Sequence, residues 1–214
     1  MDEKISAIKS WLGTGSIDIF GLPMSGKDTV AVQLAELLGG KMLSSGMIIR
    51  SMEKETHKPL SASGNLIPSD VFANWVLPYF SRPELKDFPL ILSSVGRWSG
   101  EEDAVMNFAE LAGHPIKAVI LLNISENDVT KRWELVHATG TREATSSEER
   151  ADDKKIETFQ VRLDEFRKKT LPVILHYRSL GLLVQVDADA PREVVMNSVI
   201  DGLYDFITPK DASA

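Results

Sequence analysis

The sequence predicts a three-layer α/β fold, with one parallel sheet of five strands and helices on both faces. Apolar runs with the length of buried strands lie at residues 16–20, 41–44, 89–94, 118–124 and 182–186. Segments with helical spacing of apolar residues separate these runs, and such alternation is typical of parallel strands joined by crossover helices. The first run also leads through a glycine-rich turn into a helix, which is a common beginning for this fold class.

Length and composition indicate a single domain. The chain has 214 residues, of which 43% are hydrophobic, enough for one sizeable core. The net charge of −7 opposes nonspecific binding to nucleic acid, which depends on clustered positive charge. The chain has no cysteine and four scattered histidines. Disulfides and thiol nucleophiles are thereby excluded, and a structural zinc site is not expected.

The first segment is expected to form a short amphipathic helix. Ile5, Ile8, Trp11 and Leu12 share one helical face, and we expect this face to pack on the domain rather than on a membrane or a partner. The segment is too polar and short for a signal peptide, and no run approaches about 18 apolar residues. We therefore expect no membrane association and a cytoplasmic location.

The turn after the first run, GLPMSGKDT, has the form of a phosphate-binding loop that begins at Gly21. The general pattern is G-x-x-x-x-G-K-[ST] between a strand and a helix. Gly21 and Gly26 permit a tight curl that points backbone N–H groups inward, and Lys27 can reach the phosphates. Asp28 stands where the pattern has a hydroxyl, which is delayed to Thr29. The alternative is a glycine-rich turn without a ligand.

A helix is expected directly after this loop. One side of it is apolar, and Gly39-Gly40 is a typical helix end. A carboxylate in the first turn of a helix is stabilised by the helix dipole by about 0.3–1 kcal/mol. Asp28 therefore has a purely structural explanation besides contact with the shell of a metal ion. The residues expected on the apolar side are Val30, Leu34, Leu37 and Leu38.

Two segments interrupt the alternating pattern. Residues 51–80 contain Gly64 and Pro68, and we expect short helices and turns over the sheet. Residues 134–153 are polar, and we expect a surface loop that contributes nothing to the core. The last residues, from Lys210, are expected to be frayed.

The loop spelling G-x-P-x-S-G-K-x-T resembles that of adenylate kinase and its nucleoside monophosphate kinase relatives. That family reads G-x-P-G-[AS]-G-K-G-T, so Thr29 fits its register, while Met24 and Asp28 replace two glycines. Further segments resemble the family in the same order, and the resemblance runs from about Ile17 to the end of the chain. These segments are LSSGMIIR ending at Arg50, GNLIPSD from Gly64, LILSSVGR ending at Arg97, VTKR ending at Arg132, RADD from Arg150, and ETFQVRL from Glu157 with TLP from Thr170 and then Tyr177.

The resemblance implies a P-loop kinase fold of the three-layer α/β/α type in a single domain. It implies transfer of the ATP γ-phosphoryl group to a nucleoside monophosphate, with AMP as the first candidate. The implied partners are ATP and the monophosphate, the cofactor is Mg²⁺ without zinc, and the implied state is a monomer. The implied domain division is a core of 14–50, 81–132 and 150–209, a small monophosphate-binding lobe at 51–80 and a short lid at 133–149.

The resemblance also assigns roles to residues, because phosphoryl transfer depends on positioning and on cations that stabilise spreading negative charge. Arginine suits this task, since its planar fork holds phosphate in a bidentate way. No direct metal ligand is assigned, although Thr29 or Asp28 is expected near Mg²⁺. The residues expected to bind ATP are Gly21, Met24, Ser25, Gly26, Lys27, Asp28, Thr29 and Arg132. Those expected to bind the monophosphate are Ser45, Arg50, Ile67, Arg97, Glu101, Arg150 and Arg162. Those expected to act in catalysis are Lys27, Arg132, Arg150 and Arg162.

The chain departs from the family pattern at several of these positions. Ser93 replaces an aspartate that orders the magnesium waters, Met47 replaces another aspartate, and Val136 replaces a second lid arginine. Glu101 replaces a glutamine that reads adenine. A carboxylate accepts from an amino group and cannot donate, so Glu101 could accept from adenine or from cytosine, or it could have turned away. We hypothesise that Asp28 takes over the magnesium-shell role lost at Ser93.

Two alternative functions stay open at this stage. One keeps the fold and changes the acceptor to CMP, UMP, a deoxynucleotide or another small molecule. Arg50 and Arg97 favour an acceptor that already bears phosphate. The other alternative is a catalytically weak nucleotide-binding regulator, which Ser93, Glu101 and Val136 favour. It is opposed by the intact cations Lys27, Arg132, Arg150 and Arg162.

Overall fold

A single parallel sheet organises the protein. The structure is a computed structural model that describes residues 1–61, 63–139 and 155–208. Within this part the sheet has five strands in the order β2-β3-β1-β4-β5, all pairing in parallel. The predicted α/β class and each predicted strand are confirmed. The strands are β1 (Ser16–Gly21), β2 (Lys41–Ser44), β3 (Leu90–Ser93), β4 (Ile116–Asn123) and β5 (Leu183–Asp187).

Helices occupy the connections between the strands, as crossover links between parallel strands require. Two short 3₁₀ segments follow α4, and a π-helical turn joins α7 to α8. The helices are α1 (Asp2–Leu12), α2 (Lys27–Leu38), α3 (Ser45–Thr56), α4 (Ser69–Trp75), η1 (Leu77–Ser81), η2 (Pro83–Leu85), α5 (Glu101–Leu111), α6 (Glu126–Thr139), α7 (Ile156–Glu165), η4 (Phe166–Thr170), α8 (Leu171–Ser179) and α9 (Arg192–Ile207).

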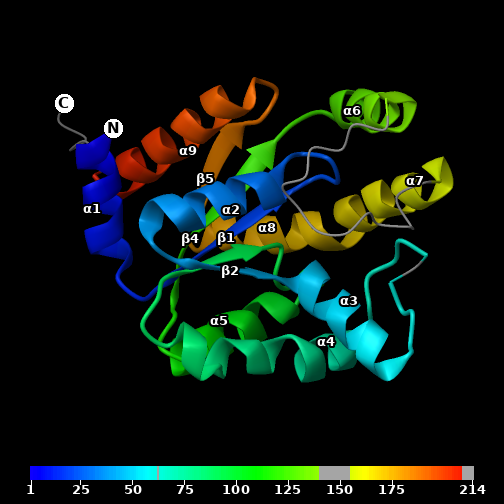
Figure 1. The fold of residues 1–214 in the computed structure, drawn as a ribbon, viewed down its shortest axis with the longest axis horizontal. Helices are drawn as coiled ribbons and strands as arrows, with labels where there is room; N and C mark the ends of the chain where they lie inside the picture. Colours follow the sequence, from blue (N-terminus) through cyan, green and yellow to red (C-terminus); the bar gives the residue numbers. More distant parts are fainter. Residues whose placement is uncertain (62, 140–154, 209–214) are drawn as a thin grey trace.

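The helices form a layer on each face of the sheet, with α2 and α9 on one side and α5 on the other (Figure 1). Successive side chains of a strand point to opposite faces. In β1, Ile17 and Ile19 accordingly join the core beneath α2 and α9, while Phe20 packs with Tyr177 of α8 on the other face. The fold is therefore a three-layer α/β/α sandwich. Asp18 lies on the same face as Phe20, inside the sheet.

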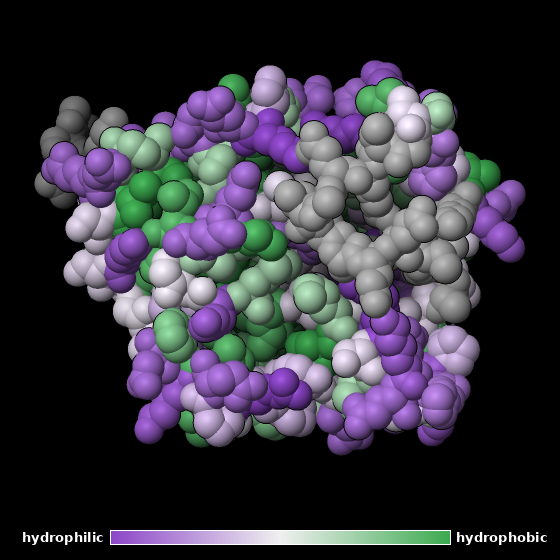
Figure 2. All heavy atoms as spheres, viewed as in Figure 1, coloured by the Kyte–Doolittle hydropathy of each residue, from purple (hydrophilic) through white to green (hydrophobic). Residues whose placement is uncertain are grey.

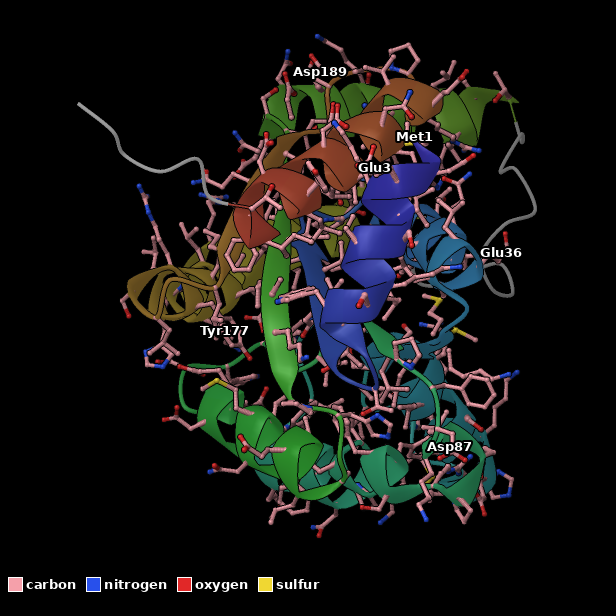
Figure 3. The ribbon with its side chains drawn as sticks, turned by 90° about the vertical axis from the view of Figure 1, so that its left-hand side faces the viewer. Met1, Glu3, Glu36, Asp87, Tyr177 and Asp189 are labelled. Carbon is pink, nitrogen blue, oxygen red and sulfur yellow. The ribbon has the colours of Figure 1, made fainter. Side chains whose placement is uncertain are left out.

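The N-terminal helix packs on the domain as predicted. Ile8 and Leu12 are fully buried, and the ring of Trp11 meets Phe206 of α9 edge-on at 6.1 Å. Lys4 forms an ion pair of 2.8 Å with Asp201 of α9. Figure 3 shows α1 lying beside α9. No helix in the described part of the chain is long and apolar enough to cross a lipid bilayer.

Two details of the predicted elements are wrong. Leu37 is 38% exposed, because Ala31 and Ala35 complete the buried face of α2 and turn Leu37 toward its edge. Residues 134–139 were expected in a loop, but α6 continues through Thr139. Trp133 explains this extension, since its ring stacks on His137 at 3.9 Å and on Phe159 of α7 at 5.7 Å. Residues 140–153 and 209–214 lie outside the described part.

Candidate active site

The site lies at the edge of the sheet where the strands end. Because all strands run parallel, their carboxyl ends meet at this edge, and ligands of open α/β sheets bind there. Ser93, the last residue of β3, is paired with Ile19 of β1 and with Ser44 of β2. The loop after β1 and the turn after β3 therefore begin side by side, and each leads into a helix.

The predicted phosphate-binding loop joins β1 to α2. Met24 and Gly26 have left-handed backbone angles, with φ of 66° and 90°, and these produce the curl. Gly21 has no room for a side chain, because an added Cβ would lie 2.5 Å from Ser25 Oγ. Lys27 begins α2 and is buried. Backbone N–H groups at the start of α2 and the charge of Lys27 together favour an anion at this point.

The first turn of α2 contacts the end of β3. Ser93 Oγ donates a hydrogen bond of 2.5 Å to Asp28 Oδ1. Asp28 and Thr29 are both half-buried. Carboxylate and hydroxyl oxygens are ligands that Mg²⁺ accepts, directly or through water. The oxygen groups beside the loop are of the kind that Mg²⁺ accepts together with phosphates, and the described residues hold no cluster of three or more acidic or histidine ligands. The hypothesis that Asp28 compensates for Ser93 stays a prediction.

A cavity of about 650 Å³, part of it open to solvent, lies between α3, α4 and the turn after β3. It is lined by every described residue that the resemblance assigned to the monophosphate. Arginine side chains reach it from three different segments, the arrangement expected around a phosphate group. Those residues are Ser45, Arg50, Ile67, Arg97, Glu101 and Arg162.

A second hollow of about 320 Å³ connects this cavity to the phosphate-binding loop. Gly21 and Pro23 of the loop line it, together with Thr170 at the end of the π-helical turn. Arg97 and Arg162 line both hollows. These two cations therefore stand between the space for an acceptor and the loop for a phosphate donor.

The turn that carries Arg97 is held by the carboxylate of Glu101. Glu101 Oε2 accepts hydrogen bonds from the backbone N–H of Arg97 at 2.8 Å and of Trp98 at 3.0 Å. Its other oxygen, Oε1, accepts from Ser69 Oγ at 2.7 Å. Glu101 thus faces the cavity and has not turned away. Three hydrogen bonds from the protein already occupy much of its capacity to accept.

Ser45 also holds this turn through a hydrogen bond. Its hydroxyl, predicted to lie near the base of the monophosphate, donates a hydrogen bond of 2.7 Å to the carbonyl of Ser94. Ser94 has a left-handed φ of 52°, which residues other than glycine rarely adopt. The start of α3 is thereby tied to the turn after β3 across the floor of the cavity.

One wall of the cavity rests on α7. A Cβ added at Gly64 would lie 2.8 Å from the carbonyl oxygen of Thr158, so only glycine fits there. The backbone N–H of Leu66 donates to Glu165 Oε2 at 3.0 Å. Lys169 binds the same oxygen at 2.5 Å.

Lys169 also lies over the ring of Trp98, which lines the cavity. Its ammonium group lies 3.9 Å from the ring centre of Trp98, a distance typical of a cation–π contact. Glu165, Lys169 and Trp98 were not predicted. Their sequence positions look like an ordinary helix surface, and the contacts depend on the tertiary fold.

Two predicted catalytic arginines are not brought to these hollows by the described part of the chain. Arg132 of α6 donates to the carbonyl oxygen of Ala188 at 2.7 Å and lies 3.9 Å from Asp189. It lines neither hollow. Arg150 lies outside the described residues. The catalytic roles of both stay predictions.

Asp18 is a buried acid that the sequence reasoning passed over. It is 0% exposed in the middle of β1, and its carboxyl group accepts from the backbone N–H of Val95 at 3.2 Å. Burial raises the pKa of Asp18 to about 8, although the hydrogen bond from Val95 and the charge of Arg97 oppose this rise. An acid inside the apolar run SIDIF was the signal that could have identified it.

Comparison with known proteins identifies the family to which the chain belongs. No protein-family model matches the chain. The adenylate kinase of Bartonella bacilliformis is 32% identical over 200 residues, which cover 86% of this chain and 99% of that protein. Adenylate kinases of Thermus thermophilus and Methanosarcina mazei are 29% and 27% identical over 191 and 207 residues, covering 86% of this chain and 95% and 96% of theirs. The chain therefore belongs to the adenylate kinase family, and it is a phosphotransferase.

Proposed function

We propose that the chain transfers the γ-phosphoryl group of ATP to AMP and produces two molecules of ADP. The observation that carries this proposal is the pair of joined hollows. Arg50, Arg97 and Glu101 line the larger one, and Arg97 continues with Arg162 into the smaller one beside the phosphate-binding loop. An acceptor phosphate in the first hollow would face a donor phosphate on the loop.

Phosphoryl transfer requires that the protein position both substrates and supply positive charge around the phosphate oxygens. Lys27 and the N-terminus of α2 hold the phosphates of ATP. Arg50 and Arg97 hold the phosphate of the acceptor through bidentate hydrogen bonds. Arg162, which lines both hollows, stabilises the charge that develops on the transferred group.

Magnesium is part of the proposed donor complex. Bound with ATP, Mg²⁺ neutralises charge on the phosphate oxygens. The groups of this chain that would hold it are the hydroxyl of Thr29 and, directly or through water, the carboxylate of Asp28 beside Ser93.

Exclusion of water is the second task of the protein, because water would otherwise take the phosphoryl group. We assign it to the lobe at 51–80, whose contacts with α7 through Gly64 and Leu66 cover the cavity. We also assign it to the short lid at 133–149, with Arg132 and Arg150 closing on the transferred group.

Glu101 supports AMP as the acceptor, with CMP as the second candidate. Its Oε2 already accepts two backbone N–H groups, whereas Oε1 accepts one hydroxyl. Each carboxylate oxygen has two lone pairs, so Oε1 retains one for an exocyclic amino group. Adenine carries such a group at C6 and cytosine at C4. Guanine presents a carbonyl oxygen at C6, with its amino group at C2 instead, and uracil and thymine present a carbonyl oxygen at C4, which a carboxylate repels.

A coupled assay of ADP formation from ATP and Mg²⁺ tests the proposal against AMP, CMP, UMP, GMP and dTMP. We expect AMP to be turned over fastest, CMP more slowly, and the others at least about tenfold less efficiently, the factor expected for one mismatched polar contact. Arg97→Gln should raise the KM for AMP, whereas Arg82→Gln, at an exposed arginine beside Glu84, should not. Turnover of CMP alone would select the second candidate, and no turnover of any monophosphate would favour the nucleotide-binding regulator.

A further inference from the structure

The turn after β3 has an unusual conformation for a segment that must present an arginine accurately. Ser94 and Gly96 both have left-handed backbone angles, with φ of 52° and 78°. A Cβ at Gly96 would approach Val105 of α5 to 2.9 Å, so the turn is pressed against that helix. Such a backbone persists only where surrounding contacts determine it.

The backbone N–H groups of this turn are held from two sides. From the sheet side, the N–H of Ser94 donates to the carbonyl of Ile19 at 3.1 Å, and the N–H of Val95 donates to the carboxyl group of Asp18. From the side of α5, Glu101 accepts from Arg97 and from Trp98, as described above. Two buried acids on different elements therefore hold one turn.

Stability of the sheet does not explain the acid in β1. Asp18 is fully buried, on the face of the sheet opposite Ile17 and Ile19. Burying a carboxyl group is unfavourable unless its hydrogen bonds are satisfied, and a well-packed apolar residue of similar volume is often equally stable or more stable. The position shares its face of the sheet with Phe20, where a leucine could pack.

We propose that Asp18 is a positioning residue for the acceptor monophosphate: it holds the N–H of Val95 and thereby keeps Arg97 directed into the joined hollows. Asp18 does not touch the acceptor. It acts through the turn, and Glu101 supplies the matching support from α5. This inference rests on the proposed function, since it assigns Arg97 to the phosphate of the monophosphate.

The test compares two substitutions of Asp18 with a control in the same strand. Asp18→Leu removes the acceptor for Val95, whereas Asp18→Asn keeps an oxygen that can accept the same N–H group. Ser16→Ala is the matched control, because Ser16 is also fully buried in β1 and its hydroxyl donates to His114 at 2.8 Å, far from the hollows. Each purified protein is measured for steady-state kinetics, for binding of AMP and ATP by calorimetry, and for stability by urea unfolding.

For Asp18→Leu we expect the KM and Kd for AMP to rise about tenfold, the size of effect that follows loss of one buried hydrogen-bond acceptor. The kcat and the Kd for ATP should change less than about threefold, because a contact made equally in the ground state and the transition state acts on KM. Asp18→Asn should restore the KM to within about threefold of the wild type. The leucine variant should unfold at no lower urea concentration than Ser16→Ala.

The proposal is overturned if Asp18→Leu is folded and binds AMP as tightly as the wild type. It is also overturned if the leucine variant loses affinity for AMP and ATP equally and loses stability in parallel, since that describes a structural residue. If Asp18→Leu does not fold, Asp18→Ala makes the same comparison. Failure of the proposed function is a different outcome, in which the wild type itself neither binds nor phosphorylates AMP.

Discussion

Ser93 at the end of β3 and Asp28 in the first turn of α2 share a hydrogen bond of 2.5 Å. Phosphate-binding loops of this superfamily place a loop hydroxyl and a carboxylate from a neighbouring strand around magnesium. In this chain the neighbouring strand ends in a hydroxyl, and the carboxylate comes from the helix after the loop. The carboxylate therefore lies on the helix and not on the strand, whereas the loop hydroxyl stays at Thr29.

The first prediction concerns the carboxylate of Asp28. Asp28→Asn should weaken the effect of Mg²⁺ on ATP affinity, because the amide lacks the charge that attracts the ion or its waters. We expect the ratio of ATP Kd without and with Mg²⁺ to fall about tenfold, a typical loss for a group around a bound metal. Calorimetry of ATP binding in EDTA and in Mg²⁺ measures this ratio independently of turnover.

Two further variants make the test specific to the carboxylate. Ser93→Ala leaves the acid in place and should keep most of the Mg²⁺ effect. The double variant Asp28→Gly with Ser93→Asp returns the acid to the strand and should recover what Asp28→Gly loses. An unchanged Mg²⁺ ratio in Asp28→Asn would show that the acid serves only the start of α2, where it is stabilised by the helix dipole.

The second prediction concerns pH and Asp18. Its pKa of about 8 in the folded protein lies above its ordinary value of 3.8, so the folded state binds this proton more tightly than the unfolded state does. The stability that the protonated form of Asp18 contributes to the folded state is fully present below about pH 4. It decreases as the pH rises to about 8 and is absent above that. Asparagine cannot ionise. As the pH rises within this window, the free energy of unfolding of Asp18→Asn should therefore increase relative to that of the wild type, by up to about 1.4 kcal/mol per pH unit.

Urea unfolding of both proteins at intervals from pH 5 to pH 9 measures this difference. The ionisable groups near Asp18 are Arg97 on the turn and Tyr177 on α8, and Glu102 and Asp103 of α5 lie near Tyr177. Burial raises the pKa of Tyr177 well above its usual range, so its hydroxyl does not titrate in this window. A difference between the two proteins that is the same at pH 5 and pH 9 would contradict the assignment.

The third prediction concerns the base of the acceptor. Glu101→Gln restores the amide that reads adenine in the family, since an amide can accept from the amino group of the base and donate to the neighbouring ring nitrogen. The ratio of kcat/KM for AMP to that for UMP should therefore rise about tenfold. Glu102→Gln is the matched control, since Glu102 is also buried and accepts from the N–H of Gly100, yet does not line the cavity. Equal ratios in the two variants would remove Glu101 from base recognition.

The fourth prediction concerns the wall of the cavity on α7. Gly64 and Gly113 have nearly the same left-handed φ, 83° and 85°, but only Gly64 has a neighbour in the way of a Cβ. Both alanine variants should be destabilised by about 1–2 kcal/mol through backbone strain. Gly64→Ala alone should also lower kcat/KM for AMP, by about 100-fold, because misplacement of about 1 Å can cost that much in rate.

Stability and kinetics of the two glycine variants, measured side by side, separate backbone strain from the clash with Thr158. Equal activity of Gly64→Ala and Gly113→Ala would mean that the contact between residues 64–66 and α7 is not needed for the reaction.

The sequence predicted the sheet well, because buried parallel strands are short apolar runs that need no partner to be visible. The residues that the resemblance assigned to the monophosphate stand in ordered motifs, and the structure places Arg50, Arg97 and Arg162 around one cavity. Their roles in binding stay predictions. The sequence did not predict that Glu101 would bind two N–H groups of its own turn. Whether such an acid reads a base or holds a backbone depends on hydrogen bonds across the turn, which spacing does not contain.

Other residues were missed because their environment comes from distant segments. Asp18 looks like an interruption of an apolar run, and only the fold places it under Val95. Lys169 looks like one of several helix-surface lysines, and only the approach of the turn after β3 puts Trp98 beside it. Leu37 was assigned to the core because helical spacing alone could not show that Ala31 and Ala35 already fill that face.

The central claim is that the joined hollows carry a phosphoryl group from ATP to AMP without releasing it to water. ³¹P NMR of the wild-type protein with ATP, Mg²⁺ and AMP tests this directly, because it resolves ATP, ADP, AMP and inorganic phosphate in one sample. We predict that ATP and AMP decrease in equal amounts and that ADP accumulates as the product, with no inorganic phosphate. Accumulation of inorganic phosphate while AMP stays constant, or an unchanged spectrum, would contradict the claim.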